Sequence, residues 1–132
     1  MPRLLIVDDE ESMRTLVARA IAMDDHEIVT AADGAEALEI LSNGQNAFDL
    51  LLTDIQMPVM DGIALALTAA RDLPDLTILL MTGFADQRER ASGLNAIAHD
   101  VITKPFSVAD IRSAVADALA ARKARTGNPN SP

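Results

Sequence analysis

The stretch Leu4–Asp9 (LLIVDD) decides the fold. Four consecutive apolar residues that end at two carboxylates are typical of a strand buried on both faces, as in a parallel sheet. Similar apolar runs recur at Phe48–Thr53, Leu76–Met81 and Asp100–Thr103, with a weaker one at Ile28-Val29. The sequence therefore predicts five short strands.

Helical patterns lie between these runs. Apolar residues at helical spacing predict helices over Glu11–Met23, Asp33–Asn43, Asp61–Asp72 and Asp86–Leu94, with a last one that begins at the cap residue Ser107. Five alternating strand and helix units with short connections predict an α/β fold: a doubly wound, five-stranded parallel sheet with five helices. We expect one domain over residues 1–122. Residues 123–132 are basic and then polar, and we expect a disordered tail there.

Composition narrows the class of function. The 132 residues include no cysteine, which excludes disulfides and thiolate metal sites, and the net charge of −9 argues against nucleic acid or an anionic membrane as partner. No apolar run approaches the ~20 residues of a membrane span. We expect a soluble, cytoplasmic protein that is a monomer or a weak dimer.

Chemistry-bearing residues follow four of the predicted strands. Asp8-Asp9 follow the first, Asp54 the third, Thr82 the fourth and Lys104 the fifth. Each alone has a simpler interpretation as a solvated charge, a loop residue or a helix cap. In a doubly wound sheet, however, the carboxyl ends of the strands form one edge, where the functional site lies. The conjunction predicts a single site.

Three carboxylates at one edge repel one another by on the order of 1–4 kcal/mol per close pair. Mg²⁺ relieves this repulsion and prefers oxygen ligands. A phosphoryl group is then expected as a further anionic ligand, with Asp54 as both metal ligand and nucleophile. Lys104 and Thr82 can each contact a phosphoryl oxygen.

The motifs in order resemble the receiver domain of two-component response regulators, with its flavodoxin-like (CheY-like) three-layer sandwich. They are Asp8-Asp9, Thr53-Asp54, Met57-Pro58, Asp61-Gly62, Met81-Thr82-Gly83 and Thr103-Lys104-Pro105-Phe106. The resemblance implies that Asp9, Asp54 and the Gln56 carbonyl ligate Mg²⁺, with Asp8 acting through water. It further implies that Asp54 accepts phosphate from a histidine kinase or histidine phosphotransferase, that Thr82 and Lys104 transmit the signal, and that the Lys104-Pro105 peptide is cis.

Two residues depart from the family pattern. Val101 stands where many receivers have an aromatic residue that moves on activation, and Phe84 stands at a position that is often polar. We expect both to belong to an output surface beside the helix over Asp86–Leu94.

Two segments, Met81–Ala85 and His99–Phe106, resemble single-domain receivers of alphaproteobacteria that direct substrates to the ClpXP protease in cell-cycle control. We therefore expect a phosphorylation-switched interaction module rather than an enzyme. The alternatives are a phosphate shuttle, a chemotaxis-type output and a Mg²⁺-dependent phosphohydrolase of the haloacid-dehalogenase type. The last would need a general acid two residues after Asp54, where this chain has Gln56.

Overall fold

A computed structural model describes residues 1–43, 47–83, 93 and 96–125 of the chain. Its strands are β1 (Arg3–Val7), β2 (Glu27–Ala31), β3 (Leu50–Asp54), β4 (Thr77–Thr82) and β5 (Asp100–Thr103), and its helices are α1 (Glu11–Ala22), α2 (Gly34–Ser42), α3 (Gly62–Asp72) and α5 (Val108–Arg125). The strands form one parallel sheet in the order β2-β1-β3-β4-β5. The predicted fold class is confirmed, with four helices in the described part. The predicted helix over Asp86–Leu94 lies, apart from Gly93, outside it.

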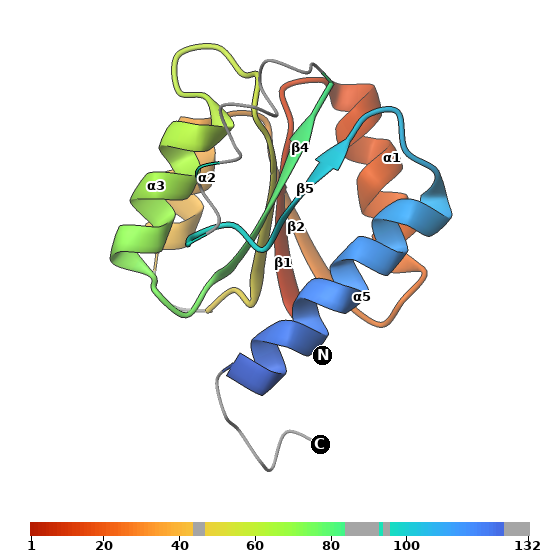
Figure 1. Ribbon diagram of the computed structural model, residues 1–132. Helices are drawn as coiled ribbons and strands as arrows, with labels where there is room; N and C mark the ends of the chain where they lie inside the picture. Colours follow the sequence, from red (N-terminus) through yellow and green to blue (C-terminus); the bar gives the residue numbers. More distant parts are fainter. Residues whose placement is uncertain (44–46, 84–92, 94–95, 126–132) are drawn as a thin grey trace.

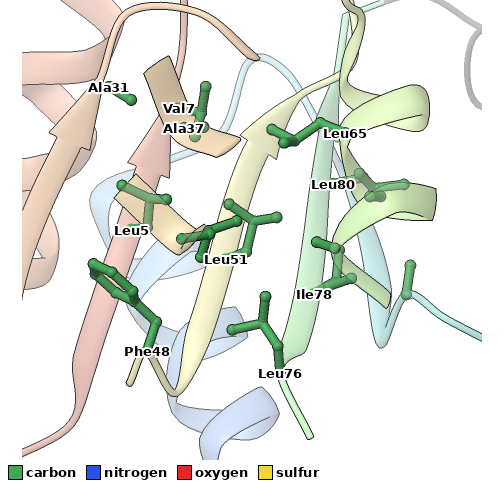
Figure 2. Packing of buried hydrophobic residues seen from close by; sticks show 14 of the residues in the cluster. Leu5, Val7, Ala31, Ala37, Phe48, Leu51, Leu65, Leu76, Ile78 and Leu80 are labelled. Carbon is green, nitrogen blue, oxygen red and sulfur yellow. The ribbon is translucent and has the colours of Figure 1, made fainter. Parts of the chain in front are cut away.

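The sheet is the middle of three layers. In Figure 1, α2 and α3 cover one face of the sheet, while α1 and α5 cover the other. One core cluster includes Leu5, Leu51 and Leu80 on the first side, and a second cluster includes Leu4, Leu52 and Leu79 on the other side. Figure 2 shows the first cluster, in which leucines of the three central strands pack beneath α2 and α3. Burial on both faces explains why these strands read as continuous apolar runs.

The strand limits differ from the sequence prediction where backbone pairing outweighs side-chain pattern. The edge strand β2 is longer than Ile28-Val29, because all five residues from Glu27 to Ala31 pair with β1. Its exposed positions, Glu27 and Thr30, carry polar side chains, which hid them from the apolar pattern. β3 begins at Leu50 rather than Phe48, and the Phe48 ring instead packs under the Arg3 guanidinium at 4.7 Å. Asp54 and Thr82 are the last residues of β3 and β4 rather than the first residues after them.

Helix caps fix where α2 and α5 begin. The Asp33 carboxylate accepts from the Glu36 N–H at 2.8 Å, and the Glu36 carboxylate accepts from the Ala32 N–H at 2.9 Å. The Ser107 hydroxyl accepts from the Asp110 N–H, and the Asp110 carboxylate accepts from the Ser107 N–H, both at 3.0 Å. Both predicted caps are confirmed.

The C-terminal helix is longer than expected. α5 runs to Arg125, so it includes the first three residues of the segment predicted as a tail, and residues 126–132 lie outside the described part. Arg122 pairs with Asp49 at 3.2 Å and Arg112 pairs with Asp24 at 2.7 Å, which ties α5 to the loops at the amino end of the sheet. Within the described residues, no helix is both long and apolar enough to cross a bilayer.

Gly62 allows α3 to start directly against the end of β3. A Cβ at this position would lie 2.1 Å from the Asp54 carbonyl oxygen and 2.9 Å from the Ile55 Cα. The Gly62 N–H donates to the Ile55 carbonyl at 2.8 Å, which closes the connection between the two elements. A larger residue must push the backbone of β3 away from α3.

We predict that Gly62→Ala lowers the free energy of unfolding by about 2 kcal/mol or more, because the methyl group overlaps main-chain atoms that cannot rotate away. Urea unfolding followed by circular dichroism measures the change. Gly93→Ala is the matched control, because no atom of the described residues lies within 4 Å of a Cβ there, and we expect a change within about 0.5 kcal/mol. Equal unfolding midpoints for Gly62→Ala and the unmodified protein would contradict the prediction.

Candidate functional site

Asp8 lies at the carboxyl end of the central strand β1 and is fully buried. Its carboxylate accepts from the Glu10 N–H at 2.9 Å, at the point where the chain turns into α1. Its carbonyl accepts from the Arg14 guanidinium at 2.8 Å, and its N–H donates to the Ala31 carbonyl at 3.3 Å. These contacts hold Asp8 in place from β2, from the turn and from α1.

Asp54 lies at the end of β3, the strand next to β1, and is almost completely buried. The Thr53 hydroxyl donates to the Asp54 carbonyl at 3.0 Å, and the Ile55 N–H continues the ladder to the Met81 carbonyl at 2.9 Å. The backbone at Asp54 is therefore fixed by β4 on one side and by Gly62 on the other. A rigid backbone aims the carboxylate at one place.

Lys104 reaches the two buried carboxylates from β5. Its ammonium nitrogen lies 3.2 Å from Asp8 Oδ2 and 3.3 Å from Asp54 Oδ1. The Lys104 N–H donates to the Thr82 carbonyl at 2.7 Å, so the lysine follows directly on the β4–β5 ladder. The Lys104-Pro105 peptide is cis, as the family resemblance implied.

Asp9 completes an acidic cluster. Carboxylate oxygens of Asp8, Asp9 and Asp54 all lie within 4.8 Å of one another, and Asp9 is exposed while its two neighbours are buried. Three ionised carboxylates and one ammonium leave a net charge of two negative units. Every atom of the acidic cluster that could bind a metal ion is a carboxylate oxygen. This set fits a hard divalent cation such as Mg²⁺, which can approach from the side of Asp9.

Burial and neighbouring charges alter the protonation of the cluster. Burial raises the pKa of Asp54 to about 6, and the carboxylates of Asp8 and Asp9 add to the increase, while Lys104 opposes it. For Lys104, burial disfavours the ammonium, but Asp54 and Asp8 outweigh this and raise its pKa. In the absence of a bound cation, the positive charge of Lys104 is therefore not enough to stabilise the Asp54 carboxylate fully.

Three of the four other predicted site residues lie in the described part of the chain. Thr82 is buried at the end of β4, one position beyond the Met81 that pairs with Asp54. Gln56 is exposed in the loop after β3, two residues from Asp54. Val101 is partly buried in β5 and packs against the core cluster under α2 and α3. Phe84 lies outside the described residues.

Sequence reasoning missed the residues that hold the acidic cluster in position. Arg14 binds the Asp8 carbonyl, and Gly62 gives the Asp54 carbonyl its space. The sequence presents the Asp61-Gly62 pair as the start of a helix and as one of the receiver-like motifs, but it carries no sign of the close approach of Gly62 to Asp54. A helical arginine one turn after a strand end is a weak signal that could have been noted.

The comparisons with known proteins agree with this geometry. Residues 4–116 match the family model of the response regulator receiver domain. The chain is 35% identical over 131 residues to the transcriptional regulatory protein PrrA of Mycobacterium tuberculosis, covering 98% of this chain and 54% of that protein. It is 34% identical over 127 residues to the probable transcriptional regulator ycf27 of Cyanophora paradoxa, covering 96% and 50%. The chain thus spans about half the length of the curated relatives it matches.

Solved structures show the same fold. The response regulator TrrA of Thermotoga maritima, solved in complex with Mg²⁺-BeF, superposes with a TM-score of 0.79 at 31% identity, covering 89% of this chain and 98% of that one. A CheY-like receiver domain protein of Methanospirillum hungatei gives a TM-score of 0.85 at 27% identity, covering 95% and 98%. The chain belongs to the response regulator receiver domain family. It is a phosphoacceptor type of signalling domain.

The raised pKa of Asp54 predicts a pH-dependent cost to stability in the metal-free protein. Relative to the ordinary value of 3.8, the folded state disfavours the carboxylate. The cost is therefore complete above about pH 6, shrinks as the pH falls, and is absent below about pH 4. We predict that Asp54→Asn, which keeps the shape but removes the charge, stabilises the protein by about 2–3 kcal/mol at pH 7.5.

Urea unfolding in EDTA at several pH values measures this difference. The two proteins should converge at low pH. A difference that stays constant from pH 7.5 to pH 4 would contradict the prediction. Asp61→Asn is a control at the partly buried N-cap of α3, close to the site, and because asparagine is also a good N-cap residue we expect only a small change.

Proposed function

We propose that this chain is the phosphorylation-switched receiver of a two-component phosphorelay, with Asp54 as the residue that accepts phosphate. One observation carries the proposal: Asp8, Asp9 and Asp54 form a cluster whose oxygens lie within 4.8 Å, and Lys104 spans the two buried members. The family match supports the same chemistry. The donors are a histidine kinase or a histidine phosphotransferase in the cytoplasm.

The family resemblance suggests a role for each residue of the site. Asp8, Asp9, Asp54 and the Gln56 carbonyl would hold Mg²⁺, with Asp8 acting through water. The bound cation offsets negative charge on the cluster and on the incoming phosphoryl group. The buried carboxylate of Asp54 is fixed by its backbone contacts, so that one oxygen can attack phosphorus.

The transfer forms a bond between an Asp54 oxygen and phosphorus and breaks the bond between phosphorus and the donor's imidazole nitrogen. The electron pair leaves with the imidazole, which takes up a proton. Lys104 is already within 3.3 Å of Asp54 and can follow the charge onto a phosphoryl oxygen, while the Thr82 hydroxyl can donate to another. Movement of these two residues would carry the change outward.

The test is phosphorylation by acetyl phosphate with Mg²⁺, read by intact-protein mass. We expect one phosphoryl group per chain, no product in EDTA, and none with Asp54→Asn. Asp49→Asn is the matched control, because Asp49 is an aspartate at the opposite end of β3. A product that persists in Asp54→Asn would refute the assignment. Rapid multiple-turnover release of phosphate from phosphomonoesters would instead favour the haloacid-dehalogenase alternative.

A finer proposal concerns the output. The segments Met81–Ala85 and His99–Phe106 resemble CpdR, a single-domain receiver of alphaproteobacteria that directs substrates to the ClpXP protease. We propose an output of this kind, with Phe84 and Val101 on the output surface. Phosphate shuttling and chemotaxis-type output remain the alternatives.

We predict that ClpX binds one of two matched forms of the protein, untreated or treated with beryllofluoride and Mg²⁺, at least tenfold more tightly than the other. The affinity is measured by surface plasmon resonance with immobilised ClpX. Phe84→Ala should weaken the tighter complex by about 1–3 kcal/mol, the range for an aromatic residue in an interface. Asp54→Asn should remove the difference between the two treatments. Equal affinity of both forms, or no binding by either, would rule out this output.

A further inference from the structure

Two glycines, each the first residue of a helix, border the loop between β3 and α3. Gly62 starts α3 against the Asp54 carbonyl. Gly34 starts α2 and lies against Met60, in the second half of the loop. A Cβ on Gly34 would lie 3.0 Å from the Met60 Cβ, Cγ and carbonyl oxygen. The loop that carries Gln56 therefore passes between the ends of two helices.

The loop has little freedom to adjust. Ile55 and Met57 are buried in the core, and Gly62 donates to the Ile55 carbonyl. At its tip, the Met60 N–H donates to the Pro58 carbonyl at 2.8 Å around Val59, which has a φ of 68°. This is a three-residue γ-turn in a conformation that a β-branched residue adopts at a cost. Because the loop is held at both ends and tightly turned at its tip, we expect a displacement at Met60 to extend along its backbone.

A Cβ on Gly34 would meet both side-chain and backbone atoms of Met60. A different rotamer of Met60 could move its Cγ away from a new methyl group, but it could not move the Met60 Cβ or carbonyl oxygen. Because Met60 is hydrogen-bonded to Pro58, and Met57 is buried just before it, a displacement at Met60 passes back toward Gln56. Gln56 is the loop residue whose carbonyl is assigned to the cation.

We propose that Gly34, which has no contact with the acidic cluster in its own right, is a positioning residue for the cation site and acts through Met60 on the loop. The inference rests on the proposed function, because it takes the Gln56 carbonyl as a ligand. A residue that acts only on α2 would behave differently. Alanine is a better helix former than glycine, so Gly34→Ala would then raise stability and leave cation binding unchanged.

The experiment measures the affinity of the metal-free protein for Mg²⁺ by titration calorimetry, for the unmodified chain and for Gly34→Ala. We expect binding to weaken by on the order of tenfold, as for other residues that orient metal ligands. The amide NMR signals of Gln56 and Met60 should shift in the metal-free variant. Gly93→Ala is the control, since in the part of the chain that the structure describes a Cβ there meets nothing within 4 Å, and its affinity should match that of the unmodified protein.

An affinity of folded Gly34→Ala within twofold of the unmodified chain would overturn the inference. If the unmodified chain itself does not bind Mg²⁺, the proposed function fails and not only this inference. Should Gly34→Ala not fold, Met60→Gly tests the contact from the loop side, because it removes both the Cβ and the Cγ that lie against Gly34. A weaker Mg²⁺ affinity for that variant supports the inference, and an unchanged affinity overturns it.

Discussion

The repulsion among Asp8, Asp9 and Asp54 is the constraint on which the rest of the structure depends. Two of these carboxylates are buried, and Lys104 supplies a single positive charge between them. Burial raises the pKa of Asp54 to about 6, so the folded protein carries an unfavourable charge at neutral pH. The fold tolerates that cost because continuous apolar strands hold the acids in place from both faces of the sheet.

The unfavourable charge at Asp54 also makes the site sensitive to ligands. A group that is already short of positive charge responds strongly to a cation or to a phosphoryl group, because each changes the local charge by more than the fold can screen. The Lys104 N–H donates a hydrogen bond to the Thr82 carbonyl, and Thr82 is the last residue of β4, the strand that pairs with β3 at Asp54. A change at the carboxylate thus has a short route to β4 and β5. Val101, on β5, is partly buried and packs against the core cluster beneath α2 and α3.

Two glycines, Gly62 and Gly34, lie beside the loop that follows Asp54. Gly62 lets α3 approach the end of β3 more closely than a side chain would permit, and Gly34 lets α2 lie tightly against Met60. The loop is then fixed by its surroundings and not by its own sequence, which places an exposed Val59 in a positive-φ turn. Preorganisation of this kind is what a cation with strict coordination geometry requires.

The sequence by itself determined the strand and helix order, the parallel sheet, and the residues at the strand ends. Continuous apolar runs and capping residues such as Asp33 and Ser107 are local signals, and the edge rule for parallel sheets places Asp8, Asp54 and Lys104 together. Only the tertiary structure decided that Asp54 and Thr82 end their strands, that β2 is five residues long, and that Arg14 and Gly62 contact the backbone of the two buried aspartates. These features depend on contacts between residues far apart in the chain, such as the hydrogen bond from Ile55 to Met81, and such contacts leave no pattern in the local sequence.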